Sequence, residues 1–344
     1  MKKLDVHMAN VVGLGAKEFV KGLLNQIEFE KDIAPQTIYY HSSSEEEYEV
    51  QCKNVIFKKY RLGIVSRLVE IFFWFLLHRS RNDILVLGDL PLNTKARQYV
   101  LCHQALIFHD FSFFDFKYWK FLLFRNIFKI FLKKNDVVLV QSLQMKIKIL
   151  KLINHKSRVE VMQVTSNSFM WPDFRRDARR RLKASQNKIR MVYPAAGYQH
   201  KNHLFVDHIS HNENLEIIFT TAPGEITFAS PHVTCIGKVS RAEIFEIYKD
   251  TDALLFLSSC ESLGLPLLEA IKCNIPILCP NRDYSFNFPS ENCIFFDIND
   301  PISIQISINK LRLRLASGWW PNWNFDKVFE KTDALTIGDI LLDR

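Results

Sequence analysis

Two glutamates stand eight positions apart in the segment SSCESLGLPLLEA. Glu261 and Glu269 flank a stretch that is broken by Gly264 and Pro266. Proline is tolerated in the first turn of a helix, where its missing N–H costs little. We therefore expect a helix to begin near Gly264–Leu265, with one carboxylate just before it and the other in its next turn.

Such a helix start combines hydrogen-bond donors with two acceptors. The first N–H groups of a helix lack intrahelical acceptors and can bind an anion, and Gly264 leaves the backbone approachable. Two carboxylates around this turn suit a ligand with hydroxyls at each end and a phosphate between, which is the layout of a nucleotide sugar. An acid near a helix start also stabilises the helix dipole, so spacing alone leaves a purely structural role open.

The elements around this segment predict where it lies. DALLFLS, residues 252–258, is an apolar strand that ends just before Glu261. Near-continuous apolar strands separated by helices predict parallel sheets covered on both faces. Ligands of such sheets bind at the carboxyl ends of the strands.

This alternation occurs twice along the chain. We expect an α/β protein of two Rossmann-like, doubly wound domains that face each other across a cleft, with the ligand in the cleft. The polar stretch TSNS is the expected linker. The predicted parts are an N-terminal acceptor-facing and membrane-facing domain, a C-terminal nucleotide-sugar domain and a tail packing back on the N-terminal domain, at residues 1–165, 166–331 and 332–344.

Composition limits the possible partners. The chain has 344 residues, 48% of them hydrophobic, and a net charge of +8. Residues 1–165 carry +9 (25 basic against 16 acidic side chains), whereas residues 166–344 carry −1 (20 against 21). A basic half points to a polyanion such as a nucleic acid, an anionic membrane or a phosphorylated ligand.

Targeting and cysteine patterns narrow the class further. No continuous apolar segment follows Lys2 and Lys3, so a signal peptide is not expected. The longest apolar run, Ile71–Leu77, is far shorter than the about 20 residues that cross a bilayer. Seven scattered cysteines without a CxxC pair argue against a zinc site or a disulfide framework. We expect a soluble or peripheral protein on the cytoplasmic side.

The segment SSCESLGLPLLEAIKCNIPILCP resembles the E-x7-E signature of glycosyltransferase family 4, whose retaining enzymes have the GT-B fold. YPAAGYQHKNH, VTCIGKVSRAEIFEIYKDTDALLFLSS and CIFFDINDP are similar to further segments of this family, so the resemblance covers residues 188–331. GLGAKEFVKGLL, LVLGDLP, VLCHQ and DVVLVQS match more weakly. The resemblance implies a nucleotide-diphosphate sugar donor and a place in bacterial surface polysaccharide assembly, such as O-antigen or capsule.

The resemblance also implies roles for residues of the C-terminal half. Glu261 would contact the donor sugar, Glu269 would hold the ribose, and Gly264 and Leu265 would offer backbone N–H groups. Lys201 would neutralise the diphosphate and help the leaving group depart. The alternative for Lys201 is a solvated lysine at a helix start.

In the N-terminal half, Gly15 would let the backbone approach the donor phosphate, and His103 would reach the donor sugar. Without the resemblance, His103 would be taken as a strand-end histidine with satisfied hydrogen bonds. Family members often have an arginine ahead of the lysine, where this chain has Tyr198 and Gln199. Lys201 would then carry the charge alone, or with Lys238 or Arg241.

Two helices of the N-terminal half could contact a membrane. Residues 117–134 interleave six basic residues with aromatic and aliphatic ones, and IVSRLVEIFFWFLLHRSR is a second candidate. This pattern suits an anionic membrane surface, although a helix that covers a sheet with snorkelling lysines would look alike. No nucleic-acid-binding signature is present, so nucleic acid is not expected as a partner.

The sequence thus predicts a retaining, metal-independent hexosyltransferase that moves a sugar to a lipid-linked saccharide acceptor. It would lie at the inner face of the cell membrane and need no cofactor, since Lys201 and helix N–H groups meet the charge of the leaving group. The alternatives are an epimerase or phosphorylase of the GT-B fold, and a non-catalytic membrane-associated scaffold that keeps a nucleotide-sugar pocket.

Overall fold

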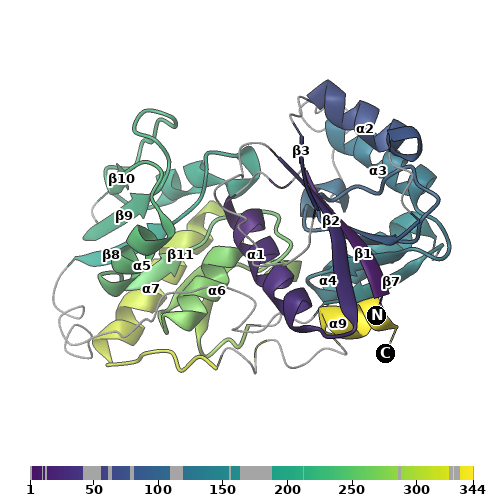
Figure 1. Cartoon of the computed structure of the whole chain (residues 1–344). Coiled ribbons are helices and arrows are strands. Elements are labelled where there is room, and N and C mark those ends of the chain that lie inside the picture. Colours follow the sequence, from purple (N-terminus) through teal and green to yellow (C-terminus); the bar gives the residue numbers. More distant parts are fainter. Residues whose placement is uncertain are drawn as a thin grey trace. The chain divides into compact units, whose positions relative to one another are not determined.

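The computed structural model describes most of the chain: residues 2–9, 11, 14–41, 56–60, 64–77, 81–108, 119–154, 156–162, 188–211, 213–285, 288–324, 328 and 334–343. The predicted linker at residues 165–168 lies outside this part, as do Lys117 and His109. The chain divides into two compact units (Figure 1). One consists of Met1–Met170 with Lys331–Arg344, and the other of Trp171–Glu330.

The first unit is a seven-stranded sheet with helices. Every strand pair is parallel, and the strand order is β3-β2-β1-β4-β5-β6-β7. Its elements are β1 (Lys2–Met8), α1 (Leu14–Phe29), β2 (Ile33–His41), β3 (Ile56–Tyr60), α2 (Ile64–Leu77), β4 (Asp83–Val86), β5 (Gln98–Leu101), η2 (Ala105–Phe108), α3 (Trp119–Phe131), β6 (Val137–Val140), α4 (Leu143–Ile153), β7 (Arg158–Val161) and α9 (Ile337–Leu342).

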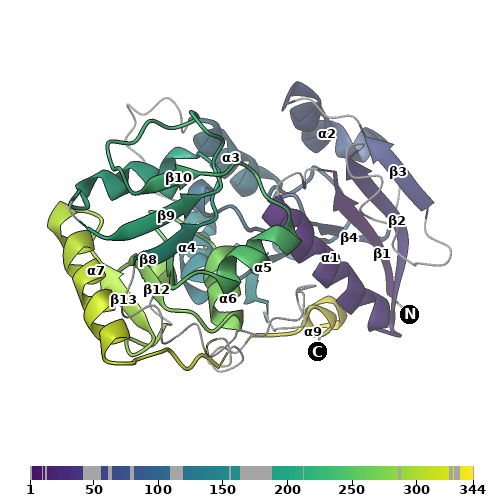
Figure 2. The ribbon, with the colours of Figure 1, turned by 90° about the vertical axis from the view of Figure 1, so that its left-hand side faces the viewer.

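The second unit is a six-stranded parallel sheet in the order β10-β9-β8-β11-β12-β13. Helix α7 packs beside β13 at one end of this sheet (Figure 2). Its elements are β8 (Ile189–Tyr193), η6 (Gln199–Lys201), η7 (His203–His208), β9 (Leu215–Phe219), β10 (Val233–Cys235), α5 (Arg241–Lys249), β11 (Ala253–Leu255), α6 (Leu265–Lys272), β12 (Ile277–Pro280), η8 (Asp283–Ser285), β13 (Cys293–Phe296) and α7 (Pro301–Ala316).

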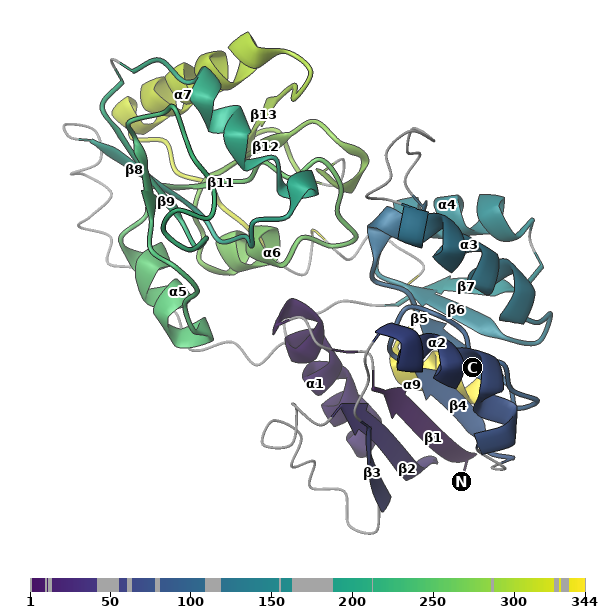
Figure 3. The same ribbon diagram turned by 90° about the horizontal axis from the view of Figure 1, so that it is seen from above.

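The predicted α/β architecture is confirmed: in both units every strand pair of the sheet is parallel. Strand β6 is apolar throughout because both faces of the sheet are covered there, and all four residues of VVLV are buried. Helices α3 and α4 lie side by side next to β6 and β7 (Figure 3). The direction of strand order reverses between β1 and β4 in the first unit and between β8 and β11 in the second. These switch points are where such folds bind ligands.

Local signals in the sequence set several element boundaries. Ser240 and Glu243 form a capping box at the start of α5, as their spacing predicts. Asn274, where glycine is common in the resembled family, has a left-handed φ of 52° after α6. No helix among the described residues is both long and apolar enough to span a bilayer.

The C-terminal helix α9 belongs to the first unit. The Lys2 ammonium donates to the carbonyl of Leu341 at 2.7 Å. The Asp343 carboxylate, just past α9, accepts from both Nη atoms of Arg97 at 2.5 and 2.9 Å and from Arg158 at 3.2 Å. The hydrogen bonds from Arg97 are the main reason that the pKa of Asp343 lies below its usual value.

We predict that Asp343→Asn loosens α9, with an acid-dependent effect. A carboxyl whose pKa is lowered on folding stabilises the fold above its unfolded pKa, and this stabilisation is lost as the pH falls through the folded pKa. Because the pair is largely solvent-exposed, the loss should be less than about 1 kcal/mol at pH 7. Hydrogen exchange of α9 should be faster in the variant at pH 7 and equal to wild type near pH 2; a pH-independent difference would contradict this.

Candidate functional site

Lys201 and Glu261, sixty positions apart in the sequence, form an ion pair at the switch point of the second unit. Lys201 ends η6, which follows β8, and Glu261 follows the neighbouring strand β11. The Lys201 Nζ donates to Glu261 Oε1, and both side chains are mostly buried, with 17% and 12% exposure. An ammonium has three N–H donors, so the pair leaves Lys201 capacity for a second acceptor such as a phosphate.

Hydrogen bonds to one carbonyl hold the two loops of this pair together. The carbonyl of His200 accepts from the Ser259 N–H at 2.8 Å, from the Ser259 hydroxyl at 3.0 Å and from the Ser258 hydroxyl at 3.3 Å. The hydroxyl of Tyr193, at the end of β8, donates to the carbonyl of Lys201 at 3.0 Å. The sequence pattern does not predict this role of the two serines, because the bonds join loops far apart in the chain.

Helix α6 begins where the sequence predicts. Gly264 precedes the helix with φ 72° and ψ 72°, and α6 begins at Leu265 with Pro266 in its first turn. A Cβ on Gly264 would lie 2.7 Å from the Leu267 side chain, so both the backbone angle and the space require glycine. Among the described residues, the N–H groups of Gly264 and Leu265 have no hydrogen-bond acceptor, which leaves them available to an anion.

Glu269 is buried in the second turn of α6, with 4% exposure. Its Oε1 accepts from Arg241 Nη1 at 2.6 Å, and its Oε2 accepts from the Tyr248 hydroxyl at 2.7 Å. Burial, and then the charge of Glu269, raise the pKa of Tyr248 well above its usual value, so the phenol remains a donor. The carboxylate predicted to hold a ribose is therefore already bonded within its own unit.

The first unit places Gly15 after β1, at its switch point, and His103 after β5, one strand beyond the switch point. His103 follows β5, and its Nδ1 lies 3.3 Å from Asp89 Oδ1, in the loop after the adjacent strand β4. The same oxygen accepts from the N–H groups of His103 and Gln104, at 2.7 and 2.9 Å. Gly15 lies in the first turn of α1, directly after β1. The neighbouring strands β1, β4 and β5 thus bring these residues to the same end of the sheet, where the carboxyl ends of the strands lie.

Asp89 is a functional candidate that the sequence does not predict. Its left-handed backbone, with φ 70°, is uncommon for a residue other than glycine. That strain turns its carboxylate toward the His103 loop. A weak signal exists in LVLGDLP, where an acid follows an apolar strand and precedes proline, but such loops are common.

The histidines near Lys201 have structural positions. His203 is buried against the rings of Tyr193 and Phe219, and burial lowers its pKa to about 4. It is therefore neutral at pH 7. The ring of His200 stacks on Tyr198, with the ring centres 5.8 Å apart.

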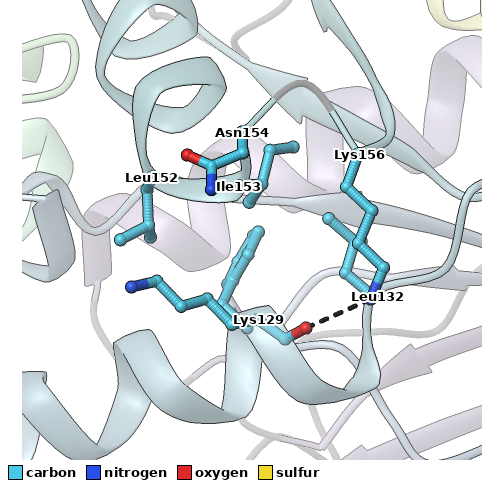
Figure 4. Close-up of a pocket in the computed structure, with 7 residues that line it drawn as sticks. Lys129, Leu132, Leu152, Ile153, Asn154 and Lys156 are labelled. Atoms are coloured by element: carbon cyan, nitrogen blue, oxygen red, sulfur yellow. Dashed lines mark hydrogen bonds between the residues drawn. The ribbon is translucent and has the colours of Figure 1, made fainter.

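One surface pocket lies away from these residues. It has a volume of about 200 Å³ and lies at the carboxyl ends of α3 and α4, which lead into the amino ends of β6 and β7 (Figure 4). The Lys156 ammonium donates to the carbonyl of Lys129 at 3.2 Å and so caps α3. The pocket lies at the amino ends of the strands, whereas His103 lies at their carboxyl ends, so the pocket is not the candidate site. Its lining consists of Phe128, Lys129, Leu132, Leu152, Ile153, Asn154 and Lys156.

One family model matches part of the second unit. Residues 225–287, which include Arg241, Glu261 and Glu269, match the family model of glycosyl transferases group 1. No curated protein matches the chain in sequence.

Solved structures share the fold over nearly the whole chain. Sucrose-phosphate synthase from Thermosynechococcus elongatus is 12% identical with a TM-score of 0.65, covering 96% of this chain and 94% of its own. WaaG, a glycosyltransferase involved in lipopolysaccharide biosynthesis, is 11% identical with a TM-score of 0.63, covering 99% and 98%. HepE of Anabaena in complex with UDP-glucose is 10% identical with a TM-score of 0.62, covering 100% of each chain. These likenesses define the GT-B fold.

We predict that Gly264→Ala lowers stability and disrupts the turn. A left-handed backbone and a contact of 2.7 Å with Leu267 both oppose a Cβ, and together they should cost about 1–3 kcal/mol. Urea denaturation measures this loss. Gly318→Ala, with φ 77° but open space around it, is the matched control. An equal loss in both variants would show that only the backbone angle matters at Gly264.

Proposed function

We propose that this protein is a retaining glycosyltransferase that moves a hexose-type sugar from a nucleotide-diphosphate sugar to a lipid-linked saccharide. The observation that supports this most is the Lys201–Glu261 pair beside the open N–H groups before α6, at the switch point of a GT-B domain. A cation next to free helix N–H groups is a site for a diphosphate. The HepE complexes, which contain UDP or UDP-glucose, support a donor of this kind.

The leaving group would be stabilised without a protein nucleophile. Lys201 and the N–H groups of Gly264 and Leu265 would take the negative charge that develops on the departing diphosphate. Glu261 is held by Lys201, which suits a carboxylate that binds sugar hydroxyls better than one that attacks carbon. With attack on the donor's own face, a phosphate oxygen would accept the proton of the acceptor hydroxyl. The configuration at the anomeric carbon would then be retained.

The role of the first unit would be to meet the sugar and the acceptor. His103, fixed through Asp89, would offer the other ring nitrogen to a sugar hydroxyl, and Gly15 would allow close approach of the donor phosphate. The likeness to WaaG supports a place in surface polysaccharide assembly, such as O-antigen or capsule, at the inner face of the membrane.

A membrane surface of the first unit would bring the site to such an acceptor. Helix α2 exposes Val69, Phe72, Phe73 and Leu76 at helical spacing, with Leu76 61% exposed. The ring of Phe72 packs edge-to-face on Phe131 at the end of α3, which places the two helices next to each other (Figure 1). Exposed apolar side chains of this number mark an interaction surface.

The basic residues of α3 and of the segment just after it divide into two groups. Lys133 is wrongly placed among the membrane-facing cations, because its ammonium donates to the carbonyl of Thr94. Arg125 donates to the carbonyl of Ile107 at 2.6 Å. The exposed cations of this segment are Lys120, Lys129 and Lys134, and these three would contact anionic headgroups.

We predict that Lys201→Met weakens binding of a nucleoside diphosphate by about 10- to 100-fold, as expected for a lost charge-assisted hydrogen bond. Lys201→Arg should lose less, because it keeps the charge. Isothermal titration with UDP and GDP measures both.

Incubation of wild type with nucleotide sugars and membrane extract, followed by NMR of the product, then tests transfer and retention. A change of the sugar without an acceptor would indicate an epimerase, and binding without turnover would indicate a scaffold.

We predict sedimentation with anionic liposomes that high salt abolishes. Each lysine near an anionic surface contributes about 1 kcal/mol, and salt screens that attraction. Changing Lys120, Lys129 and Lys134 together to Gln should therefore release the protein. Changing Lys188, Lys272 and Lys310 to Gln removes the same charge from exposed positions of the second unit and should have little effect. Equal release by both triple variants, or equal binding to neutral liposomes, would refute the proposed surface.

A further inference from the structure

The carboxylate of Glu269 is covered by a cation of its own chain. Glu269 is only 4% exposed, and Arg241, the first residue of α5, is hydrogen-bonded to its Oε1. The side chain of Arg241 is 25% exposed against 5% for that of Glu269, so Arg241 is the member of the pair that reaches solvent. On the other side, the fully buried Tyr248 holds Oε2. A ligand that approaches Glu269 from solvent therefore meets Arg241 first.

Arg241 is held by only part of its guanidinium. Its Nε and Nη2 are buried without an acceptor among the described residues. These two atoms form the side-on edge of the guanidinium, which matches a carboxylate or a phosphate bidentately. Burying donors without partners is unfavourable. In the observed position, Arg241 provides a hydrogen bond to Glu269, but its own Nε and Nη2 groups have no acceptor. Moving the Arg241 side chain outward therefore costs less free energy than it would for a fully hydrogen-bonded guanidinium.

The backbone beneath Arg241 is fixed, so the side chain would be the part that moves. Ser240 and Glu243 close a capping box around the first turn of α5. Phe245 and Tyr248 anchor the buried face of the helix. The N-terminus of α5 and that of α6 both lie at the carboxyl edge of the sheet, because each helix follows a strand and precedes the next parallel strand.

We propose that Arg241 is a displaceable cover of Glu269 that makes nucleotide recognition depend on phosphate. This inference rests on the proposed function, in which Glu269 holds the ribose. To reach Oε1, a ribose hydroxyl must replace the Arg241 guanidinium. A nucleoside diphosphate offers the displaced Arg241 guanidinium a new anion. A nucleoside has no anionic group, so its binding would separate Arg241 from Glu269 without giving Arg241 another partner. Arg241 therefore selects against nucleosides.

The test compares UDP with uridine, and GDP with guanosine, by isothermal titration. In Arg241→Met, the nucleoside no longer has to break the charge-assisted hydrogen bond between Arg241 and Glu269. We therefore expect it to bind about tenfold more tightly, which is the effect expected of one such bond. The diphosphate should bind as tightly as to wild type or more weakly. The dissociation constants of the nucleoside and the diphosphate should therefore differ less in the variant than in wild type. Arg241→Lys, which keeps a cation, should stay near the wild-type ratio. Lys249→Gln, a charge loss at the other end of α5, is the matched control.

A double variant separates this mechanism from a general change in the pocket. In Glu269→Gln, the carboxylate that Arg241 covers is gone, so adding Arg241→Met should not tighten nucleoside binding. Thermal melts show that each variant is folded before it is titrated. If Arg241→Met weakens nucleoside and diphosphate by the same factor, Arg241 is only a structural partner and the inference is overturned. If wild type binds neither diphosphate, the proposed function falls first, and this inference with it.

Discussion

The candidate site depends on one ion pair, between Lys201 and Glu261. Each residue comes directly after a strand of the second sheet, and the two strands are neighbours at the point where strand order reverses. A buried lysine beside a buried glutamate is tolerated because each neutralises the other. Three hydrogen bonds to the carbonyl of His200 fix the distance between the loops that carry them. The turn at Gly264 then places open N–H groups next to this pair.

The two units use the same plan for different tasks. In both, parallel strands bury their faces, and the candidate site residues follow the carboxyl ends of strands. In the second unit these residues are cationic and amide donors, which suit phosphate. In the first unit they are His103 and Asp89, which suit hydroxyl groups. Exposed apolar residues lie next to exposed lysines in both units, along α2 and α3 in the first and along α7 in the second.

Much of the fold could be predicted from sequence because it depends on local patterns. Apolar runs indicate the buried strands, the Ser240–Glu243 spacing marks the start of α5, and Gly264 with Pro266 marks the start of α6. The family resemblance implied that Lys201 and Glu261 share one site, and both residues follow neighbouring strands.

Side-chain pairing between distant segments could not be predicted. Arg241 lies 28 positions from Glu269, and no periodicity relates them. The contact of Lys133 with the carbonyl of Thr94 and the left-handed Asp89 behind His103 have the same origin. In each case a polar group finds its partner only after the strands and helices have packed, and the identity of the partner is not encoded nearby. The sequence therefore indicates where a site forms better than how its charges are balanced.

The most direct test of the account is a crystal structure of the protein with a bound nucleoside diphosphate, UDP or GDP. The account predicts that the diphosphate lies within hydrogen-bond distance of the Lys201 ammonium and of the N–H groups of Gly264 and Leu265. A diphosphate bound away from both Lys201 and the start of α6 would contradict it.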